Sequence, residues 1–359
     1  MKEYMPLKKS KERVRMVAEW EPHKATLLAW PHNSNTWPGN RLRLVEDVYI
    51  DILTSLLPFE DVHLLVPTEQ CAQHVQMLMT SFFDVDLRKK LFYHIIPTND
   101  CWIRDYGPIT VWKNGIGIWT CWQFNAWGGK YPPWDDDNKA AVKLAKDLNV
   151  DVRELSLILE GGSVESNGAG TLITTESVLL NPNRNPERNK DEIQLILKEN
   201  LGIETIIWLK GGIAGDDTDG HVDDITRFVS RDTIVTALAA DPADPNRSIL
   251  RENYEILKEA KDKSGNRFRV ETLPMPAPIS DQDTIDGSEY LPASYLNFYI
   301  ANGIVLVPVF GHGSDEGVLN RLKHYFPARE VVGIPSVDLV FGQGGIHCIT
   351  TSLYGHPSL

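Results

Sequence analysis

The stretch Val111-Trp112-Lys113-Asn114-Gly115-Ile116-Gly117-Ile118-Trp119 alternates apolar and other residues around an Asn-Gly pair. Asn-Gly between such runs is a strong hairpin signal, because both central residues of a type I′ turn need a positive φ. Two further pairs, Asn167-Gly168 and Asn302-Gly303, also lie between β-rich runs, and residues 227–235 have the same form with a weaker turn. The sequence therefore predicts hairpins at four places along the chain.

Each predicted hairpin is followed by a helix and then by another strand. These helices and strands are expected, in chain order, at 136–148 and 152–159, 191–201 and 205–209, 245–263 and 268–273, and 316–325 and 331–340. Residues 25–30, 42–57 and 62–66 give a further strand, helix and strand, whose missing hairpin strand is expected from 348–352. The pattern predicts about five ββαβ units closed into a ring. An α+β domain with one mixed sheet is the alternative.

Composition narrows the class of protein. The chain has 359 residues, 42% of them apolar, and a net charge of -13 from 49 acidic and 36 basic residues. Such a charge disfavours nucleic acid and anionic membranes as partners and suits a cationic substrate. No apolar run approaches the roughly 20 residues that span a bilayer. No linker rich in Pro, Gly or Ser divides the chain, so residues 1–359 are expected to form one domain.

Cysteine usage indicates a reducing compartment. None of the cysteines forms a Cys-x-x-Cys pair, so a structural zinc site is not expected, and so few in a long chain do not form a disulfide framework. The first 16 residues are rich in Lys and Arg with no apolar segment behind them, so a signal peptide is not expected. We expect a cytoplasmic protein with four reduced cysteines: Cys71, Cys101, Cys121 and Cys348.

Two of four reactive segments offer a carboxylate beside a turn. In 102–108, Asp105 can accept hydrogen bonds from a guanidinium and Trp102 can stack on it. The alternative is a structural ion pair between Arg104 and Asp105 with Trp102 in the core. In 159–163, Glu160 ends an apolar run beside two glycines, which permit close backbone approach. The alternative there is an ordinary turn.

The other two segments offer a histidine and a thiol. His221 and Asp223 stand two residues apart within 215–224, so on a strand both would face one pocket; a solvated acidic loop is the alternative. The spacing of this segment does not fit a calcium loop. In 342–350 a Gly-rich loop leads to Cys348, a candidate nucleophile. The alternative interpretation is that Cys348 is an ordinary buried hydrophobic residue. His347 would face away from Cys348 on a strand, and a structural role is expected for it.

Together these segments supply a nucleophile, an acid/base and more carboxylates than a serine-type triad needs. Surplus carboxylates suggest a cationic substrate, and a guanidinium presents five N–H donors in a plane that two carboxylates can grip.

Five segments in order resemble the agmatine deiminases, relatives of the bacterial peptidylarginine deiminases in the pentein (guanidine-modifying) superfamily. The matching segments run from about residue 16 to residue 352: Ala18–His23, Trp102–Pro108, Leu159–Gly162, Asp217–Asp223 and His347–Thr350. The resemblance implies an α/β fold, a five-bladed propeller of ββαβ units with pseudo-five-fold symmetry.

The resemblance also implies roles. Cys348 is similar in place to a nucleophile that forms an amidino-cysteine intermediate, His221 to a general acid/base, and Glu160 to the carboxylate that orients this base. Asp105 and Asp223 match a pair that binds the guanidinium. No metal and no cofactor are implied.

Two further residues match family positions near the substrate. Asp217 matches a carboxylate, and Trp102 matches an aromatic residue that forms a wall of the site. The chain departs from the family at Gly342–Gly345, where Gly-Gly-Gly-Asn is more common, at Asp219, where Asn is frequent, and at Thr351, where Gln is usual.

The implied reaction is hydrolysis of agmatine to N-carbamoylputrescine and ammonia, a step toward putrescine. Alternatives are a deiminase of peptidylarginine or free arginine, a metal-dependent hydrolase using Asp216–Asp224, and a non-catalytic binding protein. A homodimer or larger homo-oligomer is compatible with the sequence.

Overall fold

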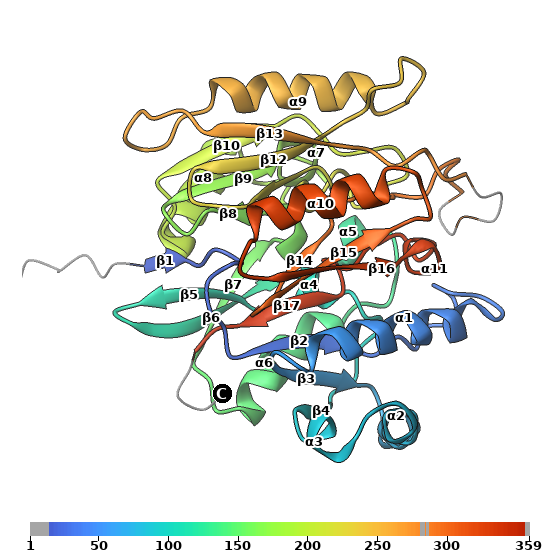
Figure 1. Ribbon diagram of the computed structural model, residues 1–359. Coiled ribbons are helices and arrows are strands. Elements are labelled where there is room, and N and C mark those ends of the chain that lie inside the picture. Colours follow the sequence, from blue (N-terminus) through green and yellow to red (C-terminus); the bar gives the residue numbers. More distant parts are fainter. Residues whose placement is uncertain (1–13, 281–283, 285–286, 356–359) are drawn as a thin grey trace, which may run out of the picture.

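The computed structural model describes residues 14–280, 284 and 287–355, and the strands of this part form five sheets. One sheet joins segments from opposite ends of the chain. In it β2 (Ala25–Ala29) pairs antiparallel with β17 (Thr350–Leu353) and parallel with β3 (Asp61–Val66). Figure 1 shows red β17 beside blue β2. The predicted pairing of a C-terminal strand with the N-terminal unit is confirmed.

This sheet is larger than predicted. An additional strand, β4 (Leu91–Ile95), pairs parallel with β3. α1 (Arg41–Leu56) connects β2 to β3, and α2 (Glu69–Phe82) and α3 (Val85–Arg88) connect β3 to β4.

The second sheet contains the hairpin predicted around Asn114-Gly115. β5 (Ile109–Lys113) and β6 (Ile116–Gln123) pair antiparallel around Asn114 and Gly115, whose φ angles of 54° and 85° fit the predicted type I′ turn. β7 (Val152–Ile158) then pairs parallel with β6 after α5 (Ala126–Gly129) and α6 (Asp137–Asp147). A short strand that was not predicted, β1 (Val14–Met16), pairs antiparallel with β5.

The remaining three sheets share one plan: an antiparallel pair, then a helix, then a strand parallel to the second. The first of these units contains β8 (Glu165–Ser166), β9 (Thr171–Thr175), α7 (Glu176–Leu179), α8 (Lys190–Leu201) and β10 (Thr205–Leu209). The next contains β11 (Thr226–Phe228), β12 (Thr233–Leu238), α9 (Arg247–Glu259) and β13 (Arg269–Pro274). The last contains β14 (Tyr299–Ile300), β15 (Ile304–Val309), α10 (Asp315–Tyr325) and β16 (Glu330–Pro335). Each predicted helix and closing strand is present.

Two of the Asn-Gly pairs do not form the predicted type I′ turn. Asn167 instead starts a longer reversal, because its side chain accepts hydrogen bonds from the backbone N–H of Ala169 at 2.9 Å and of Thr171 at 3.0 Å. In the other pair only Gly303 has a positive φ, of 77°. Asn302 is held differently because its amide donates to the carbonyl of His23 at 2.8 Å.

The strand expected over 331–340 is also shorter than predicted. It ends at Pro335, and the helical turn α11 (Val337–Val340) follows. Proline has no N–H to donate to a sheet, so it ends the ladder here.

The loop before the first strand of each antiparallel pair carries a polar side chain of the site described below. α4 (Ile103–Tyr106) precedes β5, the 3-10 turn η1 (Gly161–Ser163) precedes β8, and the 3-10 turn η2 (Val222–Asp224) precedes β11. The loops before β14 and β17 complete the set. Residues up to 243 positions apart in sequence are brought together in this way.

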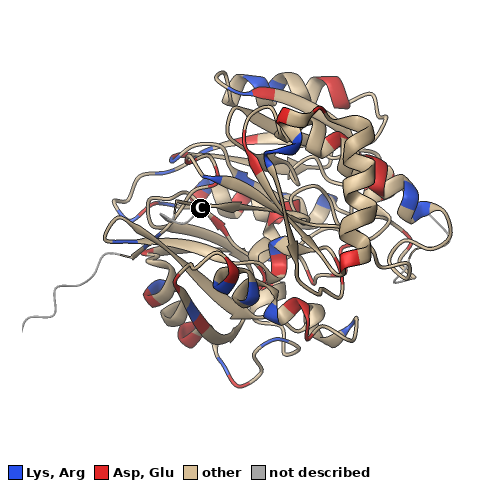
Figure 2. Ribbon diagram, turned by 90° about the horizontal axis from the view of Figure 1, so that it is seen from below, with Lys and Arg blue, Asp and Glu red and all other residues tan. Residues whose placement is uncertain are grey.

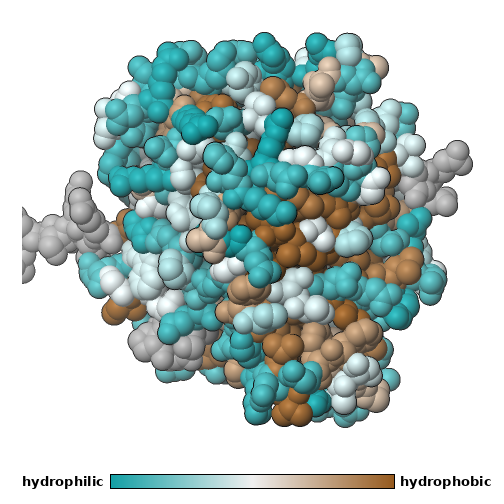
Figure 3. Space-filling view, in the orientation of Figure 1, coloured by the Kyte–Doolittle hydropathy of each residue, from teal (hydrophilic) through white to brown (hydrophobic). Residues whose placement is uncertain are grey.

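The surface mixes charges of both signs. Figure 2 shows Lys and Arg interspersed with Asp and Glu on the outer helices. Hydrophilic residues cover much of the face in Figure 3, and apolar residues also surface at its lower end, where α2 and α3 expose Met77, Phe82 and Val85. In the described part of the chain, no helix has the length and apolar character needed to span a bilayer.

One buried arginine, on β11, joins its own sheet to β8 and to the loop before β14. The Arg227 side chain is fully buried, and it donates to Glu165 at 3.1 Å, to Glu19 at 2.8 Å and to the carbonyl of Leu296 at 3.3 Å. A buried charge with complete hydrogen bonding is costly to remove, because its partners are left buried and uncompensated.

We predict that Arg227→Met lowers the free energy of unfolding by about 3–5 kcal/mol. The matched control is Arg251→Met, which removes an exposed ion pair with Glu255 and is expected to change stability by no more than about 1 kcal/mol. Urea denaturation of both variants measures the difference. Equal, small effects would contradict the importance of the buried network.

Candidate active site

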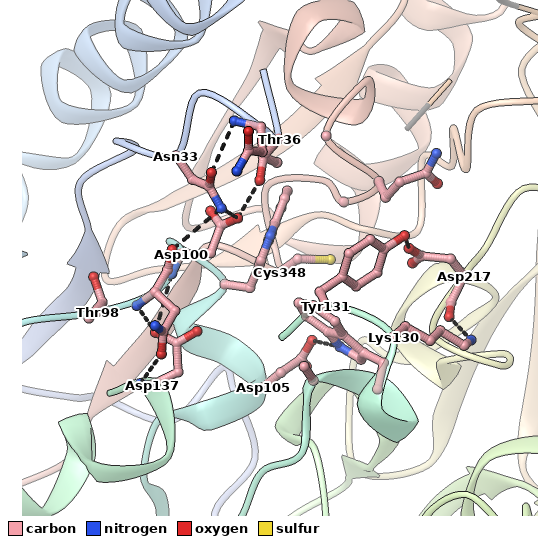
Figure 4. A pocket seen from close by; sticks show the side chains of 18 of the residues that line it. Asn33, Thr36, Thr98, Asp100, Asp105, Lys130, Tyr131, Asp137, Asp217 and Cys348 are labelled. Atoms are coloured by element: carbon pink, nitrogen blue, oxygen red, sulfur yellow. Dashed lines mark hydrogen bonds between the residues drawn. The ribbon is translucent and has the colours of Figure 1, made fainter. Parts of the chain in front are cut away.

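A cavity of about 530 Å³ opens among the loops that follow β2, β4 and β6 and the loops that precede β5 and β17. Four carboxylates and one thiol line it, and Figure 4 shows the sulfur of Cys348 pointing toward the middle of the lining side chains. These five residues are Asp100, Asp105, Asp137, Asp217 and Cys348.

Cys348 lies at the inner end of this cavity and is 6% exposed. The Asn297 side-chain amide donates to its sulfur at 3.3 Å and also to Asp224 at 2.9 Å. Burial first, and then the charges of Asp223, Asp224 and Asp105, hold the pKa of the Cys348 thiol well above its ordinary value. The thiol is therefore protonated near neutral pH until positive charge arrives.

Asp105 is fixed by two donors. Its carboxylate accepts from the indole N–H of Trp127 at 2.9 Å and from the backbone N–H of Gly162 at 3.0 Å. His221 Nδ1 lies 3.6 Å from the same carboxylate. Burial is the main cause that raises the pKa of Asp105 to about 6, opposed by His221. The alternative considered for this segment, an ion pair between Arg104 and Asp105, does not form, because Arg104 binds Glu19 at 2.9 Å instead.

The second glycine of the Glu-Gly-Gly segment explains why these groups can meet. A Cβ atom on Gly162 would lie 2.6 Å from His221 Nδ1, 2.8 Å from Asp105 Oδ1 and 3.0 Å from Asp223 Oδ2. Any side chain at this position would displace at least one of them. The glycines beside Glu160 therefore permit the close approach that the sequence suggested.

Asp223 is held by His347, for which the sequence predicted a structural role without identifying its partners. His347 Nδ1 lies 2.6 Å from Asp223 Oδ2, and its Nε2 lies 2.6 Å from Glu19 Oε2. Although burial acts to raise it, the hydrogen bond and charge of His347 bring the pKa of Asp223 below its ordinary value. His347 thus bridges two carboxylates, one of which belongs to the candidate site.

Glu160 and His221 are both buried but are not hydrogen-bonded to each other. Glu160 Oε1 accepts from Arg184 Nε at 2.6 Å. The closest ion-pair contact of His221 is the one to Asp105, and its backbone N–H donates to Asp216 at 3.0 Å. Burial lowers the pKa of His221, but Asp105, Asp223, Glu160 and Asp216 together raise it above its ordinary value.

Four buried polar atoms at this place lack any hydrogen-bond partner. They are Glu160 Oε2, Asp223 Oδ1 and both ring nitrogens of His221. Buried polar atoms are almost always paired in folded proteins, so a cluster of exceptions calls for an explanation. A ligand rich in N–H donors would satisfy the two carboxylate oxygens.

The carboxylates of residues 216–224 bind different partners and do not form one set of metal ligands. Asp216 accepts from His221 and Thr218, Asp219 from Arg184, Asp223 from His347, and Asp224 from Asn297. Among the described residues, no three His, Cys, Asp or Glu side chains gather in a way that suits a metal ion.

At the other end of the cavity, Asp217 accepts a hydrogen bond from the Tyr131 hydroxyl, as Figure 4 shows. Trp102 lies on the cavity wall and packs against Trp37, with ring centroids 5.4 Å apart. Both residues therefore line the cavity that contains Cys348.

Sequence reasoning missed several residues of this site. Trp127 and Lys130 follow β6 in Asn125-Ala126-Trp127-Gly128-Gly129-Lys130, where the paired glycines were an available signal. Asn297, Arg184 and the part played by Glu19 had no such signal, because their partners are distant in sequence.

Comparison with known proteins agrees with this arrangement. The model of the Porphyromonas-type peptidyl-arginine deiminase family matches residues 15–353. The agmatine deiminase of Stutzerimonas stutzeri is 35% identical over 93% of this chain and 94% of its own. The agmatine deiminase of Enterococcus faecalis superposes with a TM-score of 0.87 at 30% identity, covering 95% of this chain and 96% of its own. A cysteine-to-serine variant of C. jejuni agmatine deiminase with substrate bound superposes with a TM-score of 0.86 at 30% identity. The match covers 98% of this chain and 99% of that structure's chain.

The fold shared with these structures is the mixed α/β pentein fold. This chain belongs to the Porphyromonas-type peptidyl-arginine deiminase family, in which the agmatine deiminases lie. The family resemblance carried by the five sequence motifs is confirmed.

The raised pKa of the thiol has a measurable consequence. We predict that the rate at which iodoacetamide alkylates Cys348 in the ligand-free protein still rises above pH 9, because the thiolate is the reacting species. Peptide mapping by mass spectrometry over pH 7–10.5 measures this rate, and free cysteine in the same buffer, whose rate levels off earlier, is the control. A plateau near pH 7 would contradict the prediction.

Proposed function

We propose that this protein hydrolyses agmatine to N-carbamoylputrescine and ammonia through an amidino-cysteine intermediate. The observation that carries the proposal is the buried cluster of partnerless polar atoms on Glu160, His221 and Asp223. This cluster adjoins Asp105, which lines the cavity together with the Cys348 thiol. A guanidinium has the N–H donors and the positive charge that this cluster lacks. The names of the relatives as agmatine deiminases support the choice of substrate.

In this mechanism Asp105 and Asp223 hold the guanidinium. Both oxygens of Asp105 are held by protein donors, one by Trp127 and the other by the backbone N–H of Gly162. One oxygen of Asp223 is held by His347, so both carboxylates are in place before the substrate binds. The second oxygen of Asp223 is the partnerless one. Fixed partners orient the guanidinium carbon toward the thiol and lower the entropic cost of attack. Asp217 and Trp102 would contact the rest of the substrate.

The bound cation changes the ionisation of the thiol. The charges of Asp223, Asp224 and Asp105 oppose thiolate formation in the empty site, and a guanidinium neutralises part of this charge. Cys348 then loses its proton to solvent, and its sulfur bonds to the guanidinium carbon while the π electrons of one C–N bond move onto nitrogen. Substrate binding and nucleophile activation are thereby coupled.

His221 carries the proton transfers. It protonates the departing nitrogen as the C–N bond breaks, which releases ammonia and leaves the amidino group on the sulfur. It then takes a proton from water, whose oxygen bonds to the same carbon. The C–S bond breaks, the thiolate leaves and the ureido product forms. The Glu160 charge favours the protonated form of His221.

The five sheets are proposed to be the blades of a five-bladed propeller of ββαβ units, with residues 1–359 as one catalytic domain. The recurring plan of an antiparallel pair followed by a parallel strand supports this interpretation. A cytoplasmic location belongs to the same proposal, and the four free cysteines are compatible with it.

The first test of the function uses the nucleophile. With agmatine, the wild-type protein is expected to give a product one dalton heavier, because an imino group becomes a carbonyl, and Cys348→Ala is expected to reduce the rate below about one part in 10³. Cys121→Ala, a buried cysteine on β6, is the matched control and should retain activity. Mass spectrometry of the small molecule measures conversion. Product from Cys348→Ala at the wild-type rate would exclude the proposed intermediate.

The pKa of Asp105, raised to about 6, predicts the pH dependence of binding. Only the ionised carboxylate attracts a guanidinium, which stays charged at all these pH values. Below pH 6 protons compete with the substrate, and the Kd of agmatine for the Cys348→Ala variant is expected to rise by up to roughly tenfold per pH unit. Above pH 7 the contribution of Asp105 to the pH dependence should vanish.

Isothermal titration calorimetry from pH 4.5 to 8 measures this dependence. An additional Asp105→Asn substitution is the control, since it should bind weakly at every pH and lose the transition near pH 6. Constant affinity between pH 8 and pH 5 would mean that Asp105 does not bind the guanidinium as a carboxylate.

A further inference from the structure

The imidazole of His347 makes a hydrogen bond with each of its ring nitrogens, and both acceptors are buried carboxylates. Nδ1 lies 2.6 Å from Asp223 Oδ2, and Nε2 lies 2.6 Å from Glu19 Oε2. Because an ionised carboxylate only accepts hydrogen bonds, both ring nitrogens act as donors in these contacts. The ring is therefore fixed in one orientation, between the candidate site and Glu19.

The charges around the ring favour this doubly donating form. Glu19 binds Arg104 at 2.9 Å and Arg227 at 2.8 Å. Glu165 binds Arg227 at 3.1 Å. Together with Asp223, three carboxylates meet two guanidinium groups in this network, and a protonated imidazole balances the remaining negative charge. A buried network with balanced charge avoids the cost of an unpaired buried ion.

His347 is separated from the cavity that contains Cys348. It lines a second hollow of about 60 Å³, together with Glu19, and it is not among the described residues that line the cavity of Cys348. An effect of His347 on a ligand in that cavity therefore passes through Asp223. The other oxygen of Asp223, Oδ1, is the one without a partner.

We propose that His347 is a positioning residue for guanidinium binding, in which Nδ1–H keeps Asp223 ionised and oriented while Nε2–H anchors the ring on Glu19. The inference rests on the proposed function and gives the two ring nitrogens separate tasks. His347 acts through Asp223 and contacts neither the guanidinium nor the thiol, so it is not a catalytic residue.

Asp223 needs this donor because much of its surroundings oppose its charge. Burial acts to raise its pKa, and the hydrogen bond and charge of His347, followed by the charges of His221 and Arg227, bring it below its ordinary value. Without the Nδ1–H donor the pKa of Asp223 would rise, and protons would compete with the guanidinium at higher pH. The acidic groups that face this carboxylate act in the same direction: Asp105, Asp216, Asp224 and the Cys348 thiol.

Two amide substitutions separate the two ring nitrogens. In His347→Asn the amide N–H can take the place of Nδ1, and the donor to Glu19 is lost. In His347→Gln the amide N–H can take the place of Nε2, and the donor to Asp223 is lost. The matched control is His23→Gln, because His23 Nε2 also meets a buried carboxylate, Glu60 Oε2 at 3.0 Å, and lines neither hollow.

Isothermal titration calorimetry of agmatine from pH 5 to pH 8, in a Cys348→Ala background, measures the difference. With His347 intact, log Kd should rise by at most about one per pH unit on acidification, because Asp105 is the carboxylate of the pair that titrates there. His347→Gln is expected to raise Kd roughly tenfold at pH 7 and to steepen this slope toward two, since Asp223 then takes up a proton as well.

His347→Asn should keep the shallow slope and instead lose thermal stability, and His23→Gln should leave the slope unchanged. An unchanged slope in His347→Gln, or equal slopes in the two amide variants, would overturn the proposal, because a purely structural histidine predicts no difference between them. A steep slope in His347→Asn contradicts it independently. Failure of Cys348→Ala to bind agmatine and of the wild type to convert it would instead reject the proposed function.

Discussion

The buried carboxylate of Glu19 is the interaction on which the site depends. It accepts from Arg104 at 2.9 Å, Arg227 at 2.8 Å, His347 at 2.6 Å and the backbone N–H of Ile300 at 2.9 Å. Burial alone would raise the pKa of Glu19, but Arg227, His347 and Arg104 hold it well below its ordinary value. One charge thus connects the segments before β5 and β17 with the strands β11 and β14. Each needs the others, because an unpaired buried charge is costly.

The consequence for chemistry passes through His347. With its Nε2 on Glu19 and its Nδ1 on Asp223, this imidazole keeps Asp223 oriented and ionised. The imidazole beside Asp105, that of His221, lies farther away at 3.6 Å, and burial raises the pKa of Asp105 to about 6. The two carboxylates proposed to grip the guanidinium therefore differ before substrate arrives. Asp223 is held in its ionised form, whereas the charge of Asp105 responds to pH and to the ligand. This difference limits the repulsion between the two carboxylates in the empty site.

Local patterns predicted much of the fold and little of this network. The order of strands and helices follows from turns and periodicity, and Asn114-Gly115 and residues 205–209 behave as expected. Asn302 departs because its side chain bonds to His23, 279 residues away. Glu19 and His347 are separated by 328 positions, so no local signal reports their contact. Motifs found the residues proposed to meet the substrate, whereas the residues that hold them depend on packing between distant units.

The five sheets explain how such distant residues form one site. Asp105, Glu160, Asp223, Asn297 and Cys348 each stand within a few residues of the first strand of an antiparallel pair, in β5, β8, β11, β14 and β17 respectively. A strand paired in a sheet fixes the direction and position of the short loop before it. In the proposed propeller, five units around one centre would deliver five polar side chains to it. Hydrogen bonds between neighbouring loops hold Asp105, Asp223 and Asn297. The chemistry requires groups that are fixed before substrate binds, and this arrangement provides them without a long loop.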